Sequence, residues 1–239
     1  MSFTSSGEGK TESFSNVEKI QVSSVSLPVH IYESDVEQVT VTDNSKQYGI
    51  GISKDNELKQ EEGTLTFNEG KGFHIFNFSR GEIIIEVPKG LVLEYDIANV
   101  SGSIKHDAPT KNQFRCQSIS GSIRVYQGGD SGFVESVSGS IRIYASFDEL
   151  TAKSISGSVR TVANENSKQL QCSNISGSIK IQLKNVTGYD MDYSVISSQV
   201  KDLYTDTEYE KSGNASYGDK SLKIDVTNNS GSIKLTDWD

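Results

Sequence analysis

One short phrase recurs five times in this chain and constrains its fold more than any other feature. It reads SISGSIRV at residues 118–125. With its glycine taken as position 0, the five copies are centred on Gly102, Gly121, Gly139, Gly157 and Gly177, at steps of 19, 18, 18 and 20 residues. A fixed period of this length is typical of repeat proteins, in which each unit stacks on its neighbours.

Weaker copies extend the series toward both ends of the chain. Leu27 stands at position 0 of the first copy, Ser198 of the seventh, and Gly231 of the last, which follows an insertion. We expect these copies to add further units at the two ends of the stack.

The columns of the repeat predict which side chains are buried. Position +2 is Ile or Val in all five strong copies, and so is position −2, occupied by Val100, Ile119, Val137, Ile155 and Ile175. This alternation predicts one strand with positions −2, 0, +2 and +4 toward the core and −1, +1 and +3 toward solvent. The glycine would then allow a bend or a close approach of the opposite wall.

The predicted fold class is all-β: a single parallel β-solenoid, similar to a β-helix, with coils of about 18–20 residues. An antiparallel meander of hairpins is the alternative. The solenoid is favoured because the same residues recur in the same columns without reversal. We expect a flexible lead-in at residues 1–15 and one solenoid domain at 16–239. Within it, residues 16–95 would form divergent coils and a hairpin near Phe73–Phe78, and residues 96–239 the regular repeats and a C-terminal cap.

The two cysteines test this fold. Cys116 and Cys172 share column −5 but lie three coils apart. Stacked coils would separate them by about 14 Å, which is too far for a disulfide. The sequence therefore predicts two buried free thiols.

Charge is distributed unevenly along the chain. The formal net charge is −9, yet residues 96–182 carry 7 acids and 9 bases, whereas residues 1–95 carry 15 and 8. The overall acidity argues against nucleic acid as a partner. No apolar run is long enough to cross a bilayer, and the N-terminus has no signal-peptide core.

The outward columns carry the candidate binding residues. Position +3 is always a cation and position +1 is always a serine. In stacked coils like charges would lie side by side, which costs stability and suggests a role. A linear site for an anionic cell-wall polymer, a glycan or lipid headgroups is one interpretation, and a merely solvated wall is the other. The candidate residues are Lys105, Arg124, Arg142, Arg160, Lys180, Ser122, Ser140 and Ser158, with Lys201 and Lys234 in the weaker copies.

Catalytic patterns are missing from the sequence. The acids of the repeats occupy different columns, and His30, His74 and His106 have no metal-ligand spacing. We therefore expect no catalytic residues, no metal and no cofactor, although a polysaccharide-active enzyme of the β-helix type stays an alternative. Tyr126 and Tyr144 share position +5 in adjacent coils and should stack, either to stabilise the wall or to form a small platform for a sugar.

The repeated S-x-S-G-S-I-x-V phrase, after a strand that ends in Val87–Gly90, resembles a bacterial family named "putative adhesin". The resemblance runs from about Val17 to Leu235. It implies a β-strand repeat fold of unknown biochemistry, a bacterial source and a cell-envelope or cell-surface setting, and it brings no catalytic residues. We expect a non-enzymatic binding or scaffold protein, with a self-assembling structural solenoid as the alternative.

Overall fold

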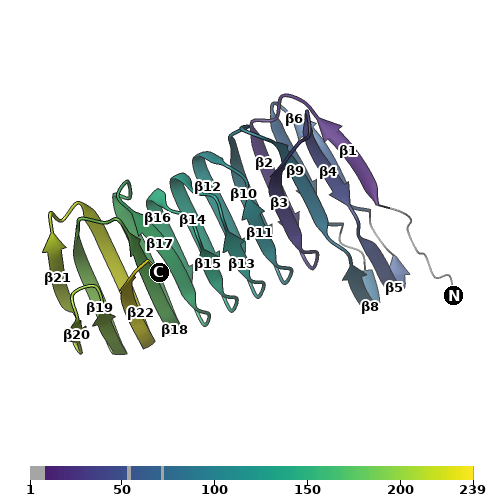
Figure 1. Ribbon diagram of the computed structural model, residues 1–239. Helices are drawn as coiled ribbons and strands as arrows, with labels where there is room; N and C mark the ends of the chain where they lie inside the picture. Colours follow the sequence, from purple (N-terminus) through teal and green to yellow (C-terminus); the bar gives the residue numbers. More distant parts are fainter. Residues whose placement is uncertain (1–8, 53–54, 71–72, 239) are drawn as a thin grey trace.

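The protein is a two-walled stack of β-coils in the computed structural model, which describes residues 9–52, 55–70 and 73–238 (Figure 1). Each regular coil contributes one strand to each wall, and the apolar side chains between the walls form one continuous core. The predicted all-β solenoid is confirmed: the described residues form strands and turns and no helix. They include no helix with the length and apolar character of a membrane span.

The first wall holds the longer strand of each coil. Along the stack, its strands are β6 (Glu57–Glu61), β7 (Thr64–Asn68), β2 (Lys19–Ser24), β10 (Leu93–Asn99), β12 (Thr110–Ser118), β14 (Gly129–Ser136), β16 (Phe147–Ser154), the first halves of β18 (Gln169–Lys184), β22 (Leu222–Asp237) and β19 (Gly188–Asp202), and β21 (Gly213–Gly218).

The second wall holds the shorter strand of each coil and carries the candidate site. Its strands are β1 (Lys10–Phe14), β4 (Val39–Asp43), β9 (Ile83–Pro88), β3 (Val29–Ser34), β11 (Ile104–Asp107), β13 (Ile123–Val125), β15 (Ile141–Ile143), β17 (Val159–Asn164), the second halves of β18, β22 and β19, and β20 (Thr207–Tyr209).

Parallel pairing holds inside the stack but not at its ends. Successive regular coils pair in parallel with the repeat columns in register, for example Ile123 with Ile141. At one end β1, β4 and β6 pair antiparallel, and at the other β20 and β21 do so. These strands end the parallel ladder, which limits edge-to-edge pairing with another chain. The expectation of a purely parallel stack is therefore corrected at both ends.

The coils do not stack in sequence order. Strand β22, with Gly231 at position 0, lies between β18 and β19, so the last repeat is inserted before the seventh. At the other end, the first coil (β2 and β3) lies between β7/β9 and β10/β11. The first and last repeats are thus internal coils rather than terminal ones, contrary to the sequence-order prediction.

Two predictions concern segments of the N-terminal region. Residues 10–14, predicted as flexible lead-in, form β1, which pairs with β4. The predicted hairpin near Phe73–Phe78 is a two-stranded antiparallel ribbon of β8 (Phe73–Arg80) with β5 (Lys46–Ile52), separated in sequence by β6 and β7. The side chains of Phe73, Phe76 and Phe78 lie outside the described residues, as do residues 1–8 of the lead-in.

The cysteine prediction is confirmed. Cys116 pairs in register with Val134, Val134 with Ala152, and Ala152 with Cys172. Both thiols are buried and free.

Candidate functional site

In four of the five strong copies the repeated phrase forms the corner between the two walls rather than one strand of one wall, and in the fifth it lies within the long strand β18. Strand β12 ends at Ser118 and β13 begins at Ile123, so positions −2 to +1 turn the chain. The buried Ser118 hydroxyl accepts a hydrogen bond from the Gly121 amide at 2.9 Å, and Ser136 and Ser154 do the same for Gly139 and Gly157. Position −3 therefore holds each corner in shape.

Asparagine performs a related task in other coils. The amide nitrogen of Asn99 donates to the Leu27 carbonyl at 2.9 Å, and that of Asn174 donates to the Gly157 carbonyl at 2.6 Å. These bonds link one corner to the next instead of closing a single corner. The corner column is consequently one continuous hydrogen-bonded edge of the molecule.

The corner overturns one prediction about the core. Position −2 was expected inside, but its five Val and Ile side chains are 38–51% exposed. The reason is the turn: once the chain bends after position −3, the strict alternation of a strand stops, and position −2 points outward together with the serine at −1. Positions +2 and +4 do face inward, as predicted.

The predicted cations lie side by side on the outer face of the second wall. Lys105 is in register with Arg124, Arg124 with Arg142, Arg142 with Arg160, and Arg160 with Lys180. Lys180 then pairs with Lys234 and Lys234 with Lys201. We call these seven residues the cation column. Neighbouring strands are about 4.8 Å apart, so the column spans roughly 29 Å.

The two ends of the cation column have different neighbours. Lys201 forms a salt bridge with Glu208 of β20 at 2.7 Å. At the other end His30 is in register with Lys105. Burial, reinforced by the Lys105 charge, lowers the pKa of His30, which favours its neutral form. Within the described part of the chain, the six cations from Lys105 to Lys234 form no salt bridge.

A groove of about 330 Å³ lies on the cation column. Four cations of successive coils and three serines surround two apolar residues in it, and no carboxylate is among its lining residues. The lining residues are Arg142, Arg160, Lys180, Lys234, Ser158, Ser178, Ser232, Val159 and Ile179. Here the structure brings predicted site residues together with Ser178, Ser232 and Lys234 of the later coils. Lys105, Arg124, Ser122 and Ser140 belong to the same columns outside the groove.

An outer column of the first wall differs from the cation column of the second wall because it contains residues of both charges and uncharged residues. One of its outer columns runs from Asp96 through Arg115, Phe133 and Thr151 to Gln171. Arg115 and Lys153 both lie over the Phe133 ring, at 5.0 and 5.6 Å from its centre. In that column Arg115 lies between an acid and an aromatic residue, so repetition alone does not create a cation column.

The tyrosine pair stacks as predicted. The rings of Tyr126 and Tyr144 lie 4.9 Å apart at an interplanar angle of 15°. The Lys105 ammonium lies 5.5 Å from the centre of the Tyr126 ring, which covers that side of the stack with a cation. These contacts stabilise the wall beside the cation column.

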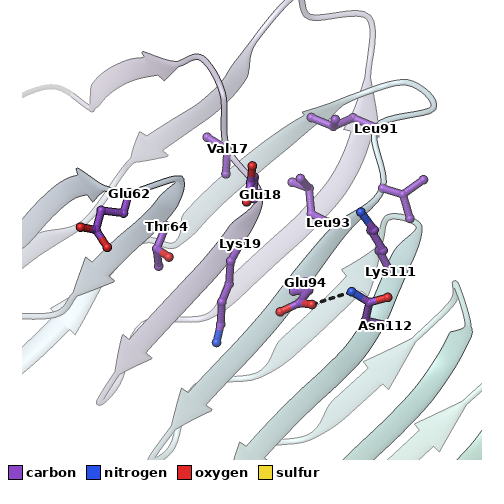
Figure 2. Close-up of a pocket in the computed structure, with 11 residues that line it drawn as sticks. Val17, Glu18, Lys19, Glu62, Thr64, Leu91, Leu93, Glu94, Lys111 and Asn112 are labelled. Atoms are coloured by element: carbon purple, nitrogen blue, oxygen red, sulfur yellow. Dashed lines mark hydrogen bonds between the residues drawn. The ribbon is translucent and has the colours of Figure 1, made fainter.

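A second hollow, of about 450 Å³, lies near the starts of β2, β10 and β12 (Figure 2). It contains Glu18, Glu62 and Glu94 together with Lys19 and Lys111. The Glu94 carboxylate accepts a hydrogen bond from Asn112 at 2.9 Å, and Figure 2 shows Glu62 on the opposite side of the hollow. The carboxylates therefore do not converge as an acid–base pair would require.

Metal-binding geometry is also missing from the described residues, which hold no cluster of three His, Cys, Asp or Glu side chains suited to a metal ion. His106 in particular is a core residue. Its ring packs against Tyr95 and Phe114, with ring centres 4.4 and 4.6 Å away. Burial lowers its pKa to about 3, so it is neutral over the physiological range.

Comparison with known proteins places the chain in a family. A model of the family described as Toastrack DUF4097 matches residues 17–144 and again residues 131–236. The chain belongs to this family. No curated protein matches it.

Three solved structures similar to this Toastrack chain come from bacteria. A "putative adhesin" from Bacteroides fragilis is 12% identical, with 95% of each chain covered and a TM-score of 0.47. A "putative adhesin" from Parabacteroides merdae is 9% identical, with 95% of each chain covered and a TM-score of 0.43. A "putative cell adhesion protein" from Clostridium sporogenes is 13% identical, covering 97% of this chain and 99% of that one, with a TM-score of 0.39.

Sequence reasoning missed one buried charge that completes the corner of the Toastrack fold. Glu69 follows β7 and is 8% exposed. Its carboxylate accepts hydrogen bonds from the amides of Val25, Ser26 and Leu27 and from the hydroxyls of Ser24 and Ser26, at 2.6–3.2 Å. In other coils such corner amides donate to the carbonyls of the preceding corner, as Ser120 does to Val100. Glu69 lies outside the repeat, so no column indicates it.

Proposed function

We propose that this protein is a non-enzymatic binding protein of the bacterial cell envelope that holds a linear polyanion along its cation column. The observation that carries the proposal is the groove, in which four cations and three serines meet without a carboxylate. The envelope setting rests on the adhesin resemblance of the repeated phrase.

The chemistry of the groove suits repeating negative charge. Cations on neighbouring strands repel one another, and an anion lying along the column would remove that cost. Arg142 and Arg160 can each hold a phosphate or carboxylate through two parallel hydrogen bonds. Ser158 and Ser178 lie beside them in the groove and can add hydroxyl donors. A polymer is favoured over a small anion because the column continues beyond the groove on both sides.

The test compares the wild type with a triple variant, Arg124→Glu/Arg142→Glu/Arg160→Glu. Binding to Gram-positive cell walls and to soluble polyphosphate would be measured between 50 and 200 mM salt. We expect the wild type to bind both ligands and to lose roughly tenfold or more of its affinity over that range. The triple variant should bind neither ligand.

The matched control reverses three cations of the first wall: Lys19→Glu/Lys153→Glu/Lys223→Glu. It changes the net charge by the same amount but leaves the cation column intact. Circular dichroism would show that all proteins are folded. Equal loss in both variants would mean that only overall charge matters, and equal binding by all three would mean that the column is a solvated wall. Either result would overturn the proposal.

A further inference from the structure

The corner of the coils carries a row of exposed apolar side chains. These are the residues at position −2, namely Val100, Ile119, Val137, Ile155 and Ile175, which we call the corner ridge. Ile196, in the same position of β19, is 77% exposed. Of the twelve large hydrophobic side chains that are exposed in the described residues, six stand in this one column. Scattered exposed apolar residues are ordinary, but an aligned row of them marks a contact surface.

Backbone hydrogen bonds fix the ridge as a straight row. The amide of Ile119 donates to the Asn99 carbonyl at 3.1 Å, and that of Val137 donates to the Ser118 carbonyl at 3.1 Å. The amide of Ile155 donates to the Ser136 carbonyl at 3.2 Å. Each rung therefore lies about 4.8 Å from the next. The row is held in place because the residue at −3 either closes its own corner, as Ser118 does, or bonds to the neighbouring corner, as Asn174 does.

The repeat itself keeps the ridge out of the core. The side chain at −3 occupies the inside of the corner, and the glycine at 0 packs against the neighbouring corner. Position −2 therefore has to face outward whatever its residue type. Serine at −1 shows that a small polar residue is tolerated on the same outer edge. Valine and isoleucine at −2 are not required by the turn, so their exposure calls for a partner.

The corner ridge and the cation column run parallel to each other, the ridge along the corner and the column along the adjoining outer face of the second wall. Position +3 follows position −2 by five residues, so their α-carbons lie at most about 17 Å apart, close enough for one extended surface to contact both. A second copy packed ridge to ridge would bring two cation columns together and repel. The partner that matches an apolar row flanked by cations is an anionic surface with an apolar interior.

We propose that the corner ridge inserts into the interface of an anionic lipid bilayer while the cation column contacts the lipid headgroups. This inference rests on the proposed function for its anion contacts, and it adds that the polyanion is presented by a membrane surface. Shallow insertion of apolar side chains combined with Lys and Arg at the headgroup level is how proteins lie on membranes without spanning them. The molecule would lie along the bilayer on its corner, with its long axis in the membrane plane.

The experiment measures sedimentation of the full chain with vesicles of equal parts phosphatidylglycerol and phosphatidylcholine, and with vesicles of phosphatidylcholine alone. A ridge variant, Ile119→Ser/Ile155→Ser/Ile175→Ser, is compared with the wild type. The control, Val92→Ser/Leu203→Ser, removes exposed apolar side chains elsewhere. Soluble polyphosphate is the second ligand for every protein, because it tests the cation column without a bilayer.

We expect the wild type to bind the anionic vesicles and not the neutral ones. The ridge variant should bind anionic vesicles at least about tenfold more weakly yet bind polyphosphate as the wild type does. The control should behave as wild type. If the ridge variant binds vesicles normally, or the wild type binds polyphosphate but not vesicles, the inference fails while the proposed function stands.

Two other results would also be decisive. If the wild type binds anionic vesicles through the ridge but ignores polyphosphate, the proposed polymer function fails and the membrane inference stands. If light scattering detects a dimer of the wild type, and the ridge variant loses both the dimer and its binding to vesicles, the ridge is the contact surface for a second copy. That result would overturn the inference.

Discussion

The α-carbon of Gly139 lies directly against the carbonyl oxygen of Gly121 in the neighbouring coil. A β-carbon placed on Gly139 would stand less than 3.0 Å from that oxygen, closer than real side chains approach backbone. The same relationship joins Gly121 to Gly102 and Gly157 to Gly139. The glycine of the repeat thus lies in the bend, one of the two roles that the sequence suggested, and it allows adjacent coils to stack closely rather than the opposite wall to approach.

Replacing Gly139 with alanine should therefore destabilise the stack. The added methyl group meets backbone, which can give way only if two coils move apart. We expect a loss of about 2–3 kcal/mol in the free energy of unfolding, measured by urea denaturation. Ser138→Ala, in the same corner but on its exposed edge, should change it by less than about 0.5 kcal/mol. Equal stabilities of the two variants would refute the tight contact.

Neutralising the carboxylate of Glu69 should be costly. Burial raises its pKa, but hydrogen bonds from Ser26, Ser24 and Val25 outweigh that effect and lower it overall. Glu69→Gln replaces an acceptor oxygen with a donor facing other donors. We expect a loss of about 2–3 kcal/mol at pH 7. Glu61→Gln, on the exposed face of β6, serves as control and should have little effect.

The contribution of Glu69 should depend on pH in a defined direction. Its pKa is lower in the folded than in the unfolded state, so its stabilisation is present above the unfolded pKa of about 4.3. It is lost as the pH falls through the folded pKa, where both states become protonated. Urea denaturation at pH 7, 4 and 3 should show the gap between wild type and Glu69→Gln narrowing toward acid. A constant gap would contradict the role of the charge.

The fold and part of the site could be predicted because the repeat encodes them locally. The same residue types recur at the same repeat positions, which indicates stacked coils. Stacking in register then aligns the cations at position +3. The exposure of Ile119 could not be read from alternation, because the buried Ser118 turns the chain one residue earlier and ends the strand. Only the hydrogen bond between Ser118 and Gly121 explains that turn.

The order of the coils could not be predicted for a different reason. Gly231 carries the same phrase as Gly177 and pairs with it directly, although the seventh coil, that of Ser198, intervenes in sequence. A β-carbon at Gly231 would meet the Gly177 carbonyl oxygen, so the place beside Gly177 favours the copy with glycine over the copy with Ser198. Glu69 lies outside the repeat and has no column to reveal it.

His106 should make the protein less stable as the pH falls below neutrality. Burial lowers its folded pKa to about 3, whereas the unfolded value is about 6.5. Above pH 6.5 neither state is protonated, so the group has no effect. Below it the unfolded state binds a proton that the folded state excludes, and stability falls. His106→Leu should remove this loss, which amounts to roughly 2 kcal/mol between pH 7 and pH 5.

The matched control for that prediction is Thr161→Val. Thr161 occupies the same core column, and its buried hydroxyl has no hydrogen-bond partner among the described residues. It does not titrate, so its replacement should shift stability equally at both pH values. Urea denaturation of the three proteins at pH 7 and pH 5 checks this. A wild type whose pH dependence matches that of His106→Leu would show that another group is responsible.

The cysteine thiols should report opening of the stack. Burial raises the pKa of Cys172 to about 12 and that of Cys116 further, so neither forms the reactive thiolate in the folded protein. We expect both to react with a chromogenic disulfide reagent at pH 8 at least about a thousandfold more slowly than in urea. Ser138→Cys adds an exposed corner thiol that should react at once. Immediate reaction of the wild type would mean that the coils separate readily, contrary to a closely stacked core.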